Sequence, residues 1–171
     1  IFKKEWSPFT VPLYAILEGL ALGSISYLYN LQYEGIVLQA ISITVLVLFS
    51  LLFAYRTKII NPTENFKLGL FAATGGIFLL YMISFIMSFF GSGISLLSSN
   101  NSSMLSIGLS LGIVIIAALN LVIDFDFIEE GSEKGAPKYM EWYGAFGLMV
   151  TLIWLYLEIL RLLAKLSSRR N

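Results

Sequence analysis

From Gly35 to Tyr55 the chain reads GIVLQAISITVLVLFSLLFAY, a run of apolar and small residues without a single charged side chain. A helix needs about 20 mostly apolar residues to cross the hydrocarbon core of a bilayer. Because no water is available there, every backbone N–H and C=O group must find a partner within the segment, which selects a helix. This run therefore predicts a membrane-spanning helix.

Four further runs have the same character, and the whole sequence predicts an all-α integral membrane protein. Strands of a membrane barrel would alternate apolar and polar residues with a period of two, and these runs do not. We expect one polytopic helix bundle, a single domain over residues 1–171. Its five predicted spans are 11–29, 35–55, 68–90, 104–128 and 141–166.

The composition supports a membrane protein and excludes several chemistries. Hydrophobic residues make up 57% of the chain and charged residues 13%, whereas soluble domains have about 45–50% and roughly 25%. Basic and acidic residues balance at 11 each, so no nucleic-acid partner is indicated. The absence of Cys and His excludes disulfides, thiol nucleophiles, imidazole catalysis and the usual zinc sites. We expect the lipid bilayer as partner, no cofactor, no catalytic residue and no enzyme activity.

Basic residues predict the orientation, because cytoplasmic loops are enriched in lysine and arginine. They occur before the first span and in the segments 56–67 and 131–138, while the other two loops have none. We therefore expect these three regions in the cytoplasm, and simple alternation then places the basic C-terminus outside, against the rule. Either the last span does not cross fully or the final charges lie too late in the chain to matter, and the sequence leaves both interpretations open. The chain starts with Ile1, followed by Lys3, Lys4 and Trp6. This start looks like the foot of an earlier helix, so we expect further helices upstream.

Small residues four positions apart predict close helix contacts in two spans. Gly19 and Gly23 lie on one ridge of the first span, and Gly108 and Gly112 on one ridge of the fourth. Such spacing lets the backbones of neighbouring membrane helices approach each other.

Acidic side chains inside a membrane are costly and usually functional. Asp124 and Asp126 lie near the end of the fourth span, about 200° apart around the helix, and Glu158 lies deep in the fifth. One interpretation is that the two aspartates mark the membrane boundary and that Glu158 only pairs with Arg161, one turn away. The other is that acids from two helices meet inside the bundle.

The second interpretation makes Asp124 and Glu158 a candidate ion-binding and pH-sensing pair. Two carboxylates in a low-dielectric site cannot both ionise cheaply, so they titrate as a unit. The pair would bind a cation when charged and close around a proton when neutral. Straight helices argue against contact, because Glu158 lies about 22 Å along its helix; contact needs residues 139–147 to lie partly outside the membrane. The candidates that would support the pair are Asn120, Arg161, Glu18 and Asp126.

Three runs resemble the bacterial branch of the Bax inhibitor-1 family, the transmembrane Bax-inhibitor-motif proteins. They are LNLVIDFDFI at 119–128, APKYMEWYGAFG at 136–147 and LYLEILRLL at 155–163. The run Leu17-Glu-Gly19 followed by Leu22-Gly23 fits as well, and the resemblance covers nearly all of the chain. It implies a seven-helix fold with a central last helix, of which this chain would be helices three to seven.

The resemblance also implies a function and a location. These are a pH-sensitive calcium leak channel, gated by an aspartate pair on the last two helices, and the bacterial inner membrane, a cell membrane. By motif position the pair falls on Asp124 and Glu158, which would bind calcium as the permeant ion. Glu158 departs from the usual aspartate, and Arg161 is more polar than the family pattern. Calcium takes six to eight oxygen ligands, so waters and carbonyls would complete the shell.

An alternative function comes from another branch of the same family. The resemblance implies a membrane-embedded regulator or interactor of a membrane-bound AAA protease. An intramembrane aspartyl protease is disfavoured, because its two aspartates occur in a motif context that this sequence lacks.

Overall fold

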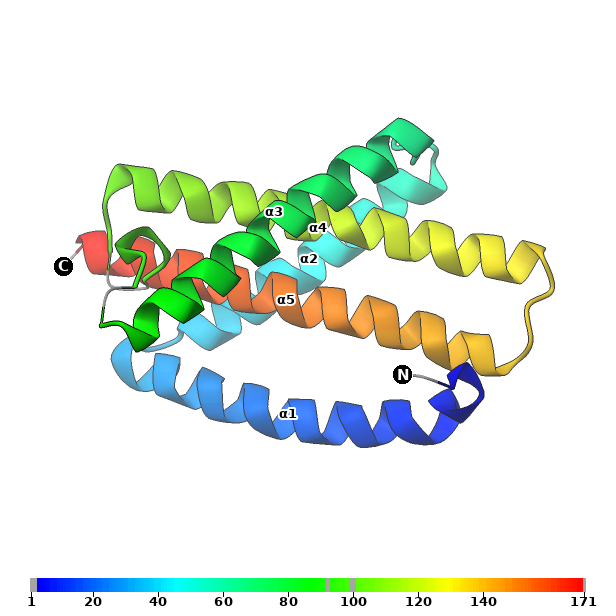
Figure 1. The fold of residues 1–171 in the computed structure, drawn as a ribbon, viewed down its shortest axis with the longest axis horizontal. Coiled ribbons are helices and arrows are strands. Elements are labelled where there is room, and N and C mark those ends of the chain that lie inside the picture. Colours follow the sequence, from blue (N-terminus) through cyan, green and yellow to red (C-terminus); the bar gives the residue numbers. More distant parts are fainter. Residues whose placement is uncertain (1–2, 92, 99–100, 171) are drawn as a thin grey trace.

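The computed structural model describes residues 3–91, 93–98 and 101–170, and nearly all of this part is helical (Figure 1). Five of its helices are long and apolar enough to cross a membrane, which confirms the predicted all-α, five-span bundle. The long helices are α1 (Ser7–Gln32), α2 (Ile36–Arg56), α3 (Glu64–Phe89), α4 (Met104–Glu133) and α5 (Tyr139–Arg170). Two short 3-10 helices, η1 (Lys4–Trp6) and η2 (Ser95–Leu97), precede α1 and α4.

Local sequence signals explain where several of these helices begin. Gly35 precedes α2 with a φ of 77°, a left-handed conformation that glycine adopts without steric cost. The side chains of Thr63 and Ser103 accept hydrogen bonds from the backbone N–H three residues later, capping α3 and α4. α1 starts at Ser7, four residues before the predicted span, and Pro12 lies inside it.

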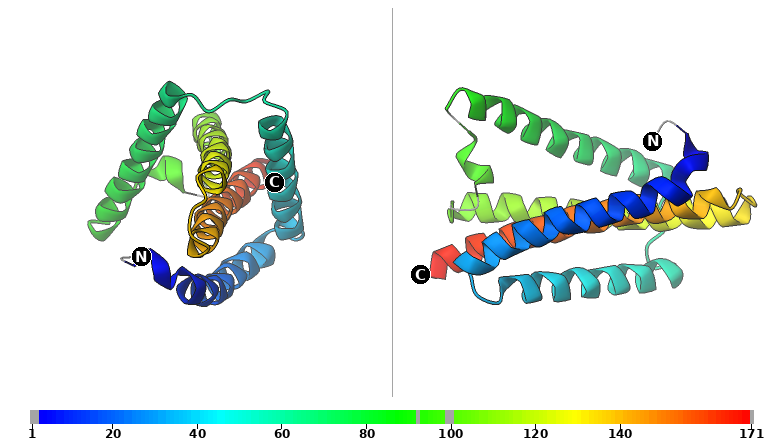
Figure 2. Two further views of the ribbon diagram at one scale, coloured as in Figure 1. Left: turned by 90° about the vertical axis from the view of Figure 1, so that its right-hand side faces the viewer. Right: turned by 90° about the horizontal axis from the view of Figure 1, so that it is seen from below.

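The central element is α5, which packs against α1, α2 and α4. Viewed end-on, α4 and α5 occupy the middle of the bundle and the other three helices surround them (Figure 2). The best-buried side chains lie where these helices meet, because apolar residues recur at helical spacing on the facing sides. They are Ile36 and Ala40 of α2, Ala117 and Leu121 of α4, and Leu155, Leu160 and Ala164 of α5.

Polar contacts tie the surrounding helices to this centre. Ser26 of α1 and the hydroxyl of Tyr156 on α5 are 2.6 Å apart, and Tyr33, just after α1, bonds to Ser168. α3 packs mainly against α4. The outward faces of α1, α2 and α3 expose many large apolar side chains, which a bilayer would solvate.

Within the part of the chain that the structure describes, the predicted close contacts at Gly19, Gly23, Gly108 and Gly112 are not formed, and there the prediction was wrong. A Cβ atom built on any of these glycines meets nothing within 4 Å. The close approach occurs elsewhere, where α4 and α5 run side by side. There a Cβ on Gly144 would lie 3.0 Å from Cγ1 of Ile128. The antiparallel hairpin therefore sets the contact, and glycine spacing alone does not.

Most of the basic residues lie at one end of the bundle. The N-terminus and the α2–α3 and α4–α5 connections lie at one end of the bundle (Figure 1), and most of the lysines and arginines lie there with them. We call this the basic end. The α1–α2 turn, the α3–α4 connection and the C-terminus lie at the opposite end (Figure 1).

Replacing Gly144 by Val should destabilise the bundle. The added side chain has to push Ile128 aside, and overpacking a tight contact costs about 1–3 kcal/mol. Gly108→Val is the matched control, because its site on α4 is open and the change should stay within about 0.5 kcal/mol. Unfolding of purified protein in detergent measures both; equal losses would show that the α4–α5 contact is not tight.

The basic end should face the cytoplasm. The chain has no native cysteine, so single cysteines at Asn61 and at the exposed Ser95 can be labelled cleanly. A membrane-impermeant maleimide added to intact cells should modify the cysteine at position 95 and spare the one at position 61. The reverse pattern would invert the orientation.

Candidate functional site

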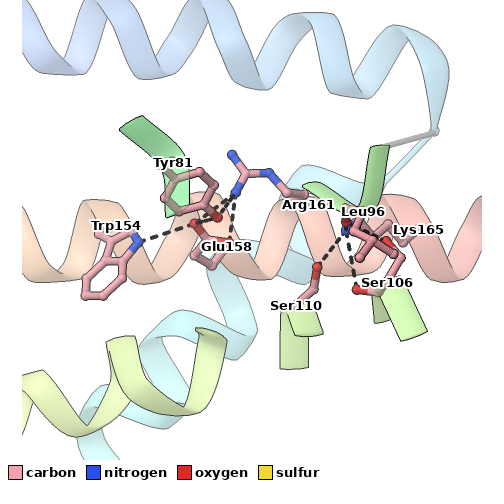
Figure 3. A network of polar contacts seen from close by, with 8 residues as sticks. All are labelled: Tyr81, Leu96, Ser106, Ser110, Trp154, Glu158, Arg161 and Lys165. Carbon is pink, nitrogen blue, oxygen red and sulfur yellow. Dashed lines mark hydrogen bonds and ion pairs between the residues drawn. The ribbon is translucent and has the colours of Figure 1, made fainter. Parts of the chain in front are cut away.

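Glu158 lies at the centre of a polar cluster within the bundle (Figure 3). It is 2% exposed. The hydroxyl of Tyr81 on α3 donates to its Oε1 at 2.7 Å, and the indole N–H of Trp154 donates at 3.3 Å. Nη1 of Arg161 lies 2.9 Å from both carboxylate oxygens. The sequence-based expectation that Glu158 pairs with Arg161 is therefore met.

Arg161 links the acid to α3. Its guanidinium donates to the hydroxyl of Tyr81 as well, and its Cζ lies 5.2 Å from the centroid of the Tyr81 ring. The Arg161 side chain keeps 26% exposure, against 3% for that of Glu158. The cluster is thus neutral as a whole, with a fully buried acid and a base that reaches its edge.

Asp124 has a different environment. It is half-buried on α4 and faces α5, where a Cβ on Gly147 would lie 3.6 Å from its Oδ1. The side chain of Thr151 is its hydrogen-bonding neighbour. Oδ2 is buried and has no hydrogen-bond partner among the described residues. Buried acceptors are normally satisfied, so this oxygen distinguishes Asp124 from the other acids of the described residues.

The structure does not bring the two carboxylates together. Of the hydrogen bonds and ion pairs in the described residues, none joins Asp124 to Glu158. Thr151, opposite Asp124, precedes Glu158 by seven residues, which is about 10 Å along α5. The argument from straight helices thus applies, and residues 139–147 pair with the end of α4 without bringing the acids level. That the two act as one titrating unit stays a prediction.

Asp126 points to another neighbour, as its position around the helix predicts. Its Oδ2 lies 2.7 Å from Nζ of Lys67 on α3, and its Oδ1 lies 3.5 Å from the Tyr55 hydroxyl of α2. Tyr55 also donates to Glu129. These contacts join three helices near the basic end, which favours the interpretation of Asp126 as a boundary residue.

The remaining candidates, Asn120 and Glu18, make contacts outside the Glu158 cluster. Nδ2 of Asn120 donates to Thr74 of α3 at 2.9 Å and to the backbone of α4, so Asn120 holds α3 against α4. Glu18 is half-buried on α1 beside Tyr14, one turn earlier. Neither residue reaches the Glu158 cluster in the contacts of the described chain.

Sequence reasoning missed two residues that take part in the buried polar contacts, Tyr81 and Lys165. No local signal singles out Tyr81, since its contact with Glu158 depends on the packing of α3. Lys165 is fully buried although its place near the C-terminus suggests a solvated charge. A signal for Lys165 exists, because it follows Trp154, Glu158 and Arg161 at helical spacing and so lies on the same stripe of α5.

No preformed metal cage accompanies these groups. Within residues 3–91, 93–98 and 101–170, no three acids come close enough to hold a metal ion. Asp124 and Thr151 together offer fewer oxygens than calcium requires.

The comparisons with known proteins agree with the fold. The family model described as "Bax inhibitor 1 like" matches residues 1–168. No match was found among curated proteins or among solved structures. The match spans all five membrane helices and includes Asp124 and the Glu158 cluster, and a helical multi-pass structure is what the chain shows. The protein therefore belongs to the Bax inhibitor 1-like family of membrane proteins.

Proposed function

We propose that this membrane protein conducts a pH-sensitive cation leak with calcium as a permeant ion, controlled by Asp124 and Glu158. The observation that carries the proposal is the buried, unpaired Oδ2 of Asp124 between α4 and α5. Acids within membrane spans commonly mark ion pathways. A calcium ion that passes here would be the transported species and not a cofactor.

In the proposed leak, Asp124 binds the cation. When ionised, its carboxylate attracts a cation and offers it an oxygen that no described side chain uses. When protonated, the same group is neutral and can donate a hydrogen bond, so the attraction is lost. Acid therefore lowers cation flux at this level of the bundle.

Glu158 is the second residue of the proposed leak and lies deeper in the bundle, on α5. While it is ionised, its charge offsets that of Arg161. The carboxylate keeps the guanidinium compensated in a region of low dielectric, where an unpaired positive charge would repel cations strongly. Asp124 thus carries the pH dependence and Glu158 keeps the path open to cations, although the two acids lie at different depths and do not touch.

The cell membrane, with the basic end inward, is the proposed location. At this end Asp124 would meet ions from the cytoplasm, and the Glu158 cluster would follow deeper in the bundle. The bacterial inner membrane fits this proposal through the resemblance of residues 119–128, 136–147 and 155–163.

Asp124→Asn should remove most of the pH dependence of calcium flux. Proteoliposomes with the purified protein, loaded with a calcium indicator, measure flux between about pH 5 and pH 8. The parent flux should fall as pH decreases, because protonation removes the attracting charge, while the variant should give a nearly flat profile.

Asp126→Asn is the matched control for this experiment. It removes an aspartate two residues away that pairs with Lys67 on the far side of the helix, so the pH profile should keep its shape. If both variants behave like the parent, the leak is not controlled by Asp124. Intact co-purification with a membrane-bound AAA protease in Asp124→Asn and Glu158→Gln, with no flux in any form, would favour the alternative function.

Glu158→Gln should destabilise the protein by about 3 kcal/mol, because it leaves the charge of Arg161 without its partner. The double change Glu158→Leu with Arg161→Leu should cost less, since it removes both charges together. Unfolding in detergent measures the free energy of unfolding of the parent, of Glu158→Gln and of the double variant. The exposed Glu133→Gln is the control and should change stability by no more than about 0.5 kcal/mol. A double variant as unstable as Glu158→Gln would show that the unpaired charge of Arg161 is not the main cause of the destabilisation.

A further inference from the structure

Lys165 is a buried cation that the proposed leak does not use. It is fully buried near the end of α5. Its Nζ donates to the carbonyl oxygen of Leu96 at 2.8 Å, to Oγ of Ser110 at 2.8 Å and to the carbonyl oxygen of Ser106 at 3.4 Å (Figure 3). An ammonium has three protons to donate, and each finds an oxygen.

The three oxygens form a built site. Ser106 and Ser110 are one turn apart on α4 and at most 2% exposed, and Leu96 belongs to η2. The hydroxyl of Ser106 donates to the same Leu96 carbonyl at 2.7 Å, which fixes η2 against α4. The site therefore closes the bundle at the end opposite the basic end, where the α3–α4 connection crosses it.

All three partners are neutral oxygens. No ion pair among the described residues includes Lys165, so its direct contacts are dipoles and not carboxylates. Burying an ammonium is costly unless its donors are satisfied. Carbonyl and hydroxyl oxygens arranged in this way are also what ion pathways use to replace the hydration shell of a cation.

We propose that Lys165 is a tethered cation that occupies an oxygen-lined site at this end of the bundle, holds η2 against α4 and α5, and excludes permeant cations. The exclusion rests on the proposed function; the holding of η2 does not. Without the ammonium, the oxygens of Leu96, Ser106 and Ser110 lose their shared donor. η2 then separates more readily from α4, and an ion or water can take the place of Nζ.

The test compares Lys165→Met with two matched variants. Methionine keeps most of the side-chain volume and removes the charge. Arg169→Met removes a charge one turn later on the same helix, where the side chain is exposed and contacts Met104. Ser110→Ala removes one acceptor and keeps the ammonium, which gives a milder variant if Lys165→Met folds poorly.

Two measurements are made on every variant. The first is the rate at which a maleimide labels a single cysteine at Leu97, a partly buried position of η2. Lys165→Met should raise this rate about tenfold, because a charge-assisted hydrogen bond that closes the segment is lost. Ser110→Ala should raise it less, and Arg169→Met should leave it unchanged. The second is the flux of potassium and of calcium in proteoliposomes, which Lys165→Met should increase several-fold and Arg169→Met should not.

The outcomes separate the two parts of the proposal. Unchanged labelling in Lys165→Met and Ser110→Ala, or an equal rise in Arg169→Met, would overturn the holding of η2. Faster labelling with unchanged flux in a conducting protein would overturn the exclusion of cations. If neither the parent nor any variant conducts, the proposed leak fails and the exclusion fails with it, while the labelling rates still decide whether Lys165 holds η2.

Discussion

The structure depends on the rule that a polar group within a membrane must find its partner inside the protein. α5 has to satisfy this rule three times, for Glu158, Arg161 and Lys165, which lie on one stripe of the helix. Glu158 and Arg161 satisfy each other and bring in Tyr81 from α3. Lys165 has no acid to pair with among the described residues and takes its oxygens from η2 and α4. The charges on the central helix therefore decide which other segments must stay close to it.

This demand explains why the bundle combines two kinds of contact. The apolar faces of α2, α4 and α5 pack tightly through small and branched residues such as Ala40, Ala117 and Leu155, which are fully buried. Between membrane helices, such packing replaces the hydrophobic driving force that acts in water. α3 packs mainly against α4, and the side chain of Tyr81 connects it to the polar cluster of α5. α3 is therefore held to the centre both by its packing on α4 and by the polar contacts of Tyr81.

Much of the fold follows from the sequence, since uncharged runs of spanning length identify the five helices and helical spacing pairs Glu158 with Arg161. Predictions that needed a partner from elsewhere in the chain were less successful. The pattern of Gly19 and Gly23 is local, and whether a helix covers it depends on the assembled bundle, in which α4 and α5 make their closest contact at Gly144. Contact between Asp124 and Glu158 required residues 139–147 to bring the two acids level, and the antiparallel hairpin instead places Gly147 and Thr151 of α5 opposite Asp124. Only tertiary structure brings Tyr81 to Glu158 and brings the oxygens of η2 and α4 to Lys165.

The charged groups lie at three different depths in the bundle. Asp124 lies toward the basic end, the Glu158–Arg161 pair lies deeper, and Lys165 lies at the opposite end beneath η2. Thr151 precedes Glu158, and Glu158 precedes Lys165, by seven residues each, so successive levels are about 10 Å apart along α5. Groups at such spacing interact weakly in a solvated protein and more strongly in a low dielectric. In the proposed leak, a cation that enters at Asp124 on α4 would thus meet the neutral Glu158–Arg161 pair next and the ammonium of Lys165 last, so this order of charges opposes passage most strongly at the far end.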